Sequence, residues 1–177
     1  MSFNYKLDVR ILQFGEGNFL RAFVGDLIDQ MNTRANFNAG IAVVQPIENG
    51  LISIIRKQKG AYTLFLKGIK KGEIIQQHKK IDHIISCNNP YEDYNSYLKL
   101  AHIDTIDFII SNTTEAGISY EEEDTFDARP PKSFPAKLTR WLWERWSHFD
   151  GNKNAGVNII PCELINYNGE TLRQIIY

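Results

Sequence analysis

Two glycines near the start of the chain, Gly15 and Gly17, have the spacing of a phosphate-binding turn. They follow a short apolar run, residues 8–14, and precede a segment whose apolar residues recur at helical spacing. A turn from a strand into a helix places backbone N–H groups and the positive helix end where a pyrophosphate can bind. Gly15 would allow the tight turn, and Gly17 would let a phosphate approach the backbone.

The glycine pattern is incomplete, so other interpretations stay open at this point. The usual third glycine of a dinucleotide-binding fingerprint would fall at position 20, which is Leu20. The turn could simply join a strand to a helix. A methyltransferase loop of the G-x-G-x-G type is a lesser rival, because position 19 is Phe19.

Polar residues that follow other apolar runs could extend a cofactor site. Gln45 ends the run 39–45, where a classical NAD site has an acidic residue for the ribose hydroxyls. Gln45 could bind a ribose but would not repel a 2′-phosphate, so NAD and NADP both remain open. Thr114 and Glu115 follow the run 106–110. Glu115 could orient a nicotinamide or a substrate hydroxyl, or it could be a helix-capping carboxylate.

The cysteines and histidines give weaker indications. Cys162 and Glu163 follow the run 157–161, and no basic group nearby would activate the thiol, so we interpret Cys162 as a small packed residue. With Cys87 the only other cysteine, neither a disulfide framework nor a zinc knuckle is indicated. The four histidines show no metal-ligand spacing, so we expect no metal site.

The elements that must position these residues alternate between strand and helix. Buried-type strands are predicted at 8–14, 39–45, 106–110 and 157–161, with another short strand at 84–86. Helices are predicted after Gly17, over 91–102, from Ser133 and Pro135 onward, and from residue 169. Segments 62–69 and 73–81 flank a turn and predict an antiparallel hairpin. The predicted fold is α/β, a doubly wound, mostly parallel Rossmann-type sheet with an inserted antiparallel hairpin.

Composition excludes several classes of protein. The chain has 177 residues, 43% of them apolar and 23% charged, with a formal net charge of −1. We expect one globular domain that does not bind nucleic acid, because a clustered basic excess is missing. No apolar run approaches the roughly 20 residues of a membrane-spanning helix, and the N-terminus has no apolar signal segment. A reducing, cytoplasmic setting is expected.

Four ordered motifs resemble those of the long-chain mannitol dehydrogenase family, and in particular its tagaturonate-reducing branch. The family's glycine loop reads G-x-G-x-F-x-R-A, which accounts for the absent third glycine. The motifs lie at residues 11–23, 113–118, 129–139 and 161–165, the last followed by Asn168-Gly169.

The resemblance implies that residues 1–177 are an N-terminal Rossmann domain that binds NAD. The intact enzyme would interconvert tagaturonate and altronate by hydride transfer. The resemblance also implies which residues contact the cofactor. The turn that binds the pyrophosphate would be formed by Gly15, Gly17, Asn18 and Phe19, with Arg21 bracing it. Gln45 would lie beside the adenosine ribose, and Thr114 and Glu115 would face the nicotinamide side. Cys162 and Glu163 would lie on the substrate side or at the junction with a second domain.

The resemblance also implies what the chain lacks. Mannitol-type relatives carry an asparagine near the reacting carbonyl where this chain has Leu164. The family's catalytic lysine belongs to a K-x4-N-x2-H motif on a helical C-terminal domain, and nothing after Asn168 supplies it. We therefore expect cofactor binding without turnover, a sugar acid bound through the missing domain, and self-association through an exposed docking face. The alternative is a non-catalytic dinucleotide-binding or interaction module.

Overall fold

Five parallel strands form the central sheet of the computed structural model, which describes residues 6–114 and 117–177. Their spatial order is β5-β2-β1-β6-β7. The strands are β1 (Asp8–Phe14), β2 (Ala39–Val44), β5 (Ile84–Asn88), β6 (Phe108–Ser111) and β7 (Asn158–Pro161). Phe14, at the end of β1, lies opposite Val44 of β2 and Ser111 of β6. The carboxyl ends of these three strands therefore meet at one edge of the sheet.

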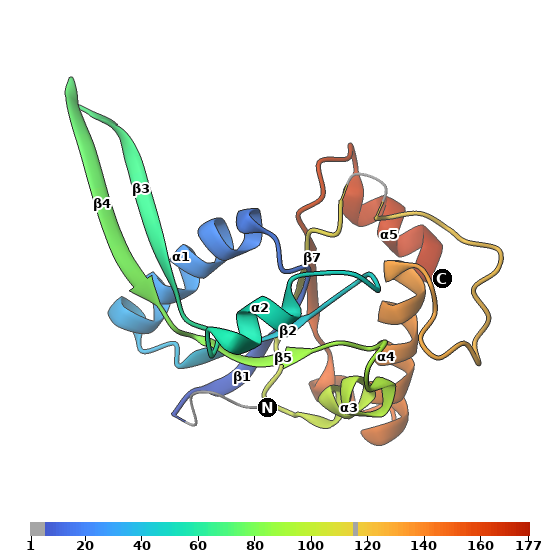
Figure 1. The fold of residues 1–177 in the computed structure, drawn as a ribbon. Coiled ribbons are helices and arrows are strands. Elements are labelled where there is room, and N and C mark those ends of the chain that lie inside the picture. The colour runs from blue at the N-terminus through green and yellow to red at the C-terminus, as the bar shows by residue number, and fades with distance from the viewer. Residues whose placement is uncertain (1–5, 115–116) are drawn as a thin grey trace.

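Helices cover both faces of this sheet, as Figure 1 shows. They are α1 (Asn18–Ala35), α2 (Ile52–Lys57), α3 (Tyr94–Lys99), α4 (Phe134–His148) and α5 (Asn168–Ile176), with 3₁₀ turns at Leu100–His102 and Lys153–Ala155. Ile11 packs with the apolar residues of α1 and α2, whereas Leu12 packs with those of α3, α4 and α5. Neighbouring residues of β1 thus point into two separate cores, which confirms the predicted doubly wound fold. None of the helices in the described part of the chain is long and apolar enough to cross a membrane.

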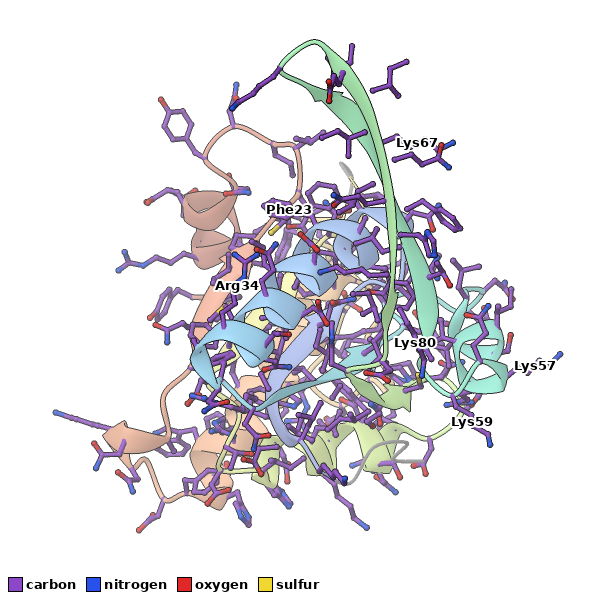
Figure 2. The ribbon with its side chains drawn as sticks, turned by 90° about the vertical axis from the view of Figure 1, so that its left-hand side faces the viewer. Phe23, Arg34, Lys57, Lys59, Lys67 and Lys80 are labelled. Carbon is purple, nitrogen blue, oxygen red and sulfur yellow. The ribbon has the colours of Figure 1, made fainter. Side chains whose placement is uncertain are left out.

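The predicted hairpin is confirmed as a separate two-stranded sheet. Strands β3 (Tyr62–Lys70) and β4 (Glu73–Ile81) pair antiparallel and project from the body beside α1 (Figure 1). The base of the hairpin contacts α1: the Tyr62 hydroxyl donates to the Arg21 carbonyl oxygen at 2.5 Å, and Lys79 Nζ lies 2.7 Å from Asp29 Oδ2. In Figure 2, Lys67 marks the far part of the hairpin and Lys80 the part nearer the body.

Most predicted elements are present, with shifted ends. The segment predicted as one helix over 91–102 is α3 followed by a 3₁₀ turn, and the strand predicted at 106–110 is β6. The helix predicted from Ser133 is α4, where the Ser133 hydroxyl accepts from the Ala136 nitrogen at 3.2 Å.

Helix α2 is an element that the sequence did not predict. It is six residues long and rich in β-branched isoleucine, so its own propensity is weak. Acceptors from elsewhere in the chain bind N–H groups at its start: Glu16 Oε1 accepts from the Leu51 nitrogen at 2.9 Å, and Gln45 Oε1 from the Ile52 nitrogen at 3.3 Å. Tertiary contacts therefore replace the local start signal that a sequence pattern would show.

Candidate cofactor-binding site

A groove of about 690 Å³ lies at the carboxyl ends of β1, β2, β5 and β6. The chain leaves β1 toward β2 on one side and reaches β6 on the other, so this is the point where the strand order reverses. In open α/β sheets, ligands bind at this point. The lining residues come from the glycine turn, the loop after β2, the start of α2, the segment after β5 and the end of β6 (Gly15, Glu16, Gly17, Gln45, Pro46, Ile47, Glu48, Asn49, Gly50, Leu51, Ser53, Asn89, Glu92, Asn112, Thr113, Thr114).

The two glycines of the turn are required for different reasons. Gly15 has a φ of +109°, and a Cβ there would lie 2.5 Å from the Asn112 carbonyl oxygen, so the fold itself demands glycine. Gly17 has a φ of −68°, which any residue adopts, and a Cβ there would meet nothing within 4 Å. Nothing in the described part of the chain explains the missing side chain at position 17. The open space in front of its backbone is suited to a ligand group.

Helix α1 begins at this open space without a side-chain cap. Its N-cap residue is Gly17, and its first turn carries no acidic side chain. The Asn18 carboxamide oxygen accepts from Arg21 at 2.6 Å and leaves the backbone N–H groups uncapped. Uncapped N–H groups at a positive helix end attract phosphates.

Three of the predicted turn residues lie outside the groove lining. Arg21 bonds Asn18, and its guanidinium carbon lies 5.7 Å from the centre of the Tyr62 ring. Phe19 stacks on Phe23 with ring centres 5.5 Å apart. These contacts brace the first turn of α1, so their direct contact with a cofactor stays a prediction.

Gln45 lines the groove, but its side chain is already engaged. It is 2% exposed, and its Nε2 donates to the carbonyl oxygens of Ile47 and Glu48, each at 2.9 Å. Its Oε1 accepts from the Ile52 nitrogen. Gln45 thereby shapes the loop after β2, and this loop brings the exposed Glu48 to the groove. The predicted contact between Gln45 and a ribose stays a prediction.

Sequence reasoning missed three acidic residues of the groove, namely Glu16, Glu48 and Glu92. Glu16 is buried between the two glycines, and burial raises the pKa of its carboxyl above the ordinary value. Glu92 pairs with Arg56, and this hydrogen bond lowers the pKa of Glu92. Among the described lining residues there is no lysine or arginine. A signal for Glu48 was present in the sequence, because it is a carboxylate three residues after the predicted ribose position.

At the end of β6, the predicted residues divide between the groove and the interior. Thr114 lines the groove and has a φ of +126°, a left-handed conformation that is costly for a β-branched residue. Glu115 lies outside the described residues. Glu163 is buried and accepts from Ser111 Oγ at 3.0 Å, the Thr113 nitrogen at 3.0 Å and Thr113 Oγ1 at 3.1 Å. It ties the end of β7 to the end of β6 behind the groove.

Cys162 lies next to Glu163 and is not activated as a nucleophile. Burial and the neighbouring Glu163 carboxylate raise the pKa of the thiol, so it stays protonated. Both Cys87 and Cys162 are free. In residues 6–114 and 117–177 we find no cluster of three or more histidine, cysteine or acidic side chains that could hold a metal ion.

Comparisons with known proteins agree with this geometry. Residues 9–177 match the family described as the mannitol dehydrogenase Rossmann domain. The chain is 49% identical over 168 residues to altronate oxidoreductases of Cronobacter sakazakii and Escherichia coli. Each match covers 94% of this chain but 35% of the relative. The chain therefore spans about a third of the length of these relatives.

Solved structures show the same fold at lower identity. Mannitol 2-dehydrogenase of Pseudomonas fluorescens, in a ternary complex with NAD and D-mannitol, superposes with a TM-score of 0.79 at 17% identity. That match covers 96% of this chain and 36% of the other. A substrate-free D-sorbitol dehydrogenase gives a TM-score of 0.78 at 18% identity, covering 97% of this chain and 37% of the other. With the family matched over residues 9–177, the chain belongs to the mannitol dehydrogenase family, of which it carries the Rossmann domain.

Proposed function

We propose that this chain is the NAD-binding part of an oxidoreductase that interconverts tagaturonate and altronate. The observation that carries the cofactor assignment is the open space in front of Gly17, at the uncapped start of α1, inside a groove at the strand-order reversal. This is the arrangement in which dinucleotides bind Rossmann domains. The substrate assignment is supported by the relatives at 49% identity, which are named altronate oxidoreductases.

Each part of the groove has a separate task in this proposal. The N–H groups at the start of α1 hold the pyrophosphate, since the described lining residues offer no cationic side chain. The loop shaped by Gln45 receives the adenosine ribose. Thr114 borders the part of the groove that receives the nicotinamide, and its neighbour Thr113 is held by a hydrogen bond to Glu163. Bound NAD would supply the nicotinamide carbon that exchanges a hydride with the sugar acid.

The residues that move the substrate proton are proposed to lie in a helical domain outside residues 1–177. The support is that the altronate oxidoreductases are almost three times as long as the part matched here. We therefore expect the 177-residue chain to bind the cofactor without reducing tagaturonate.

A titration of the chain with NADH tests the cofactor assignment. Tryptophan emission is followed while NADH is added, and energy transfer to the nicotinamide should rise to saturation. NADH oxidation with tagaturonate should stay at the rate without protein. The absence of a saturable signal at millimolar NADH would overturn the assignment, and turnover would place a catalytic group within this chain.

We also propose that the chain associates with a second copy of itself. The flank of α1 exposes four apolar side chains, each between 41% and 52% exposed (Phe19, Phe23, Leu27, Met31), and Figure 2 shows Phe23 on the outer side of the helix. Exposed apolar stripes of this kind often mark contact surfaces. Sedimentation velocity over a range of concentrations would detect a dimer, and Phe23→Ser should weaken it.

A further inference from the structure

We propose that the dinucleotide binds to this groove together with a proton, which is taken up by Glu16. The inference rests on the proposed function, and it concerns a residue between the two glycines that the dinucleotide fingerprint leaves unspecified. Glu16 would be a positioning residue, because it acts on the cofactor through the loop that it holds and through its charge.

The carboxylate of Glu16 joins the glycine turn to the loop after β2. Its Oε1 accepts from the Leu51 nitrogen at 2.9 Å. The loop is packed closely against it, since a Cβ at Gly50 would lie 2.0 Å from Glu16 Oε1. Glu16 thus holds together the two segments that receive the pyrophosphate and the adenosine. Glu16 lines the groove, and the residue is 6% exposed.

The charged groups around Glu16 would not neutralise the additional negative charge that a bound pyrophosphate brings into the groove. On α1, Arg21 attracts the carboxylate, but its guanidinium bonds Asn18 and does not line the groove. On the loop after β2 and the segment after β5, the charged lining residues are Glu48 and Glu92. The lining residues at the ends of β2 and β6 are uncharged (Gln45, Asn112, Thr113, Thr114).

Burial already favours the protonated form of Glu16, and its pKa is raised despite the opposing effects of Leu51 and Arg21. A bound pyrophosphate would bring two negative charges into the same groove and displace water from it. Both effects disfavour the ionised carboxylate further. Protonation and cofactor binding must then promote each other by linkage.

Isothermal titration calorimetry tests the proposal with ADP-ribose as the probe, because its pyrophosphate does not titrate in this range. Titrations at pH 6 in two buffers of different ionisation enthalpy give the number of protons bound. We expect uptake of up to about half a proton and a dissociation constant that rises with pH, by up to about tenfold over the whole titration of Glu16 for one unit of pKa coupling. Adenosine, which lacks the phosphates, should bind without proton uptake.

Glu16→Gln keeps an acceptor for the Leu51 nitrogen and removes the charge. We expect it to bind ADP-ribose with no proton uptake, no pH dependence and an affinity at pH 8 about tenfold tighter than that of the unmodified chain. Glu92→Gln is the matched control in the same groove. It should retain the proton uptake whatever its affinity, because Arg56 keeps the pKa of Glu92 low.

The outcomes separate this inference from the proposed function. Binding of ADP-ribose to the unmodified chain without proton uptake would overturn the role of Glu16, even if Glu16→Gln failed to fold. Equal uptake by the unmodified chain and by folded Glu16→Gln would overturn it as well. The absence of binding at every pH would instead contradict the proposed function, and the inference with it.

Discussion

The carboxylate of Glu163, just beyond β7, accepts hydrogen bonds from both the backbone nitrogen and the hydroxyl of Thr113, just beyond β6, at 3.0 and 3.1 Å. A third bond comes from Ser111 Oγ at 3.0 Å. Thr113 immediately precedes the left-handed Thr114, so the strained conformation at the groove is held from the interior. The position of Thr114 therefore depends on a residue that does not line the groove.

Removing this support should destabilise the protein. We expect Glu163→Ala to lower the free energy of unfolding by about 2–4 kcal/mol, because three buried donors lose their charged acceptor. Urea denaturation followed by circular dichroism measures the change. Thr113→Ser keeps both donors and should cost less than about 1 kcal/mol. Equal losses for the two variants would contradict the role of the hydrogen bonds.

The two glycines of the turn should respond differently to the same substitution. Gly15→Ala should destabilise the fold by about 3 kcal/mol or more, because it combines a positive φ with a clash against the Asn112 carbonyl oxygen. Gly17→Ala should change stability by less than about 1 kcal/mol but weaken NADH binding at least tenfold, since its Cβ enters the open space. Thermal melts and NADH titrations of both variants test the contrast. Undiminished binding by Gly17→Ala would place the pyrophosphate elsewhere.

Lys137 should make the free energy of unfolding depend on pH in the alkaline range. Its side chain is fully buried, its Nζ donates to the Lys132 carbonyl oxygen at 2.7 Å, and burial lowers its pKa to about 8. The unfolded chain keeps this proton up to about pH 10.5, so it binds more protons than the folded chain between those values. The stability that Lys137 contributes is therefore present above pH 10.5 and is lost as pH falls through 8.

The measurement compares the unmodified chain with Lys137→Met by urea denaturation from pH 7 to 10.5. The unmodified chain should gain about 3 kcal/mol relative to the variant over this range. Other groups that titrate at alkaline pH affect both proteins alike and cancel in the difference. If the free energies of unfolding of the two proteins changed with pH in parallel, the ammonium group of Lys137 would be solvated in the folded state.

The acidic groove should select the cofactor without a 2′-phosphate. Glu48 is presented by the loop that Gln45 shapes, and the described lining residues include no cation to neutralise a phosphate there. We expect NADH to bind at least tenfold more tightly than NADPH, and Glu48→Lys to narrow the difference. Competition between the two nucleotides measures it. An equal affinity for both would place the ribose away from Glu48.

The sequence predicted the elements whose signals are local. The strand at β1 and the hairpin strand β4 have the predicted bounds, and the Ser133 cap was identified from the sequence. These features depend on patterns within a few residues, such as apolar runs, a turn or an N-cap hydroxyl.

The remaining features depend on contacts between distant residues. Helix α2 is capped by Glu16, which is 35 positions from its partner Leu51. Gln45 lines the groove, but the hydrogen bonds of its amide follow from how the loop after β2 folds back, which the sequence does not show. The burial of Glu163 could not be read from the sequence, since its partners lie about 50 positions away.

The central position of β1 sets an order for the assembly of the protein. The Gly15 nitrogen donates to the Val44 carbonyl oxygen at 3.0 Å, and the Asn112 nitrogen donates to the Phe14 carbonyl oxygen at 3.0 Å. During synthesis, β1 and the turn at Gly15 therefore become enclosed only after Asn112, almost a hundred positions later, has been made. Until then β1 exposes an unpaired, apolar edge, the kind of edge that chaperones and aggregates engage in nascent chains.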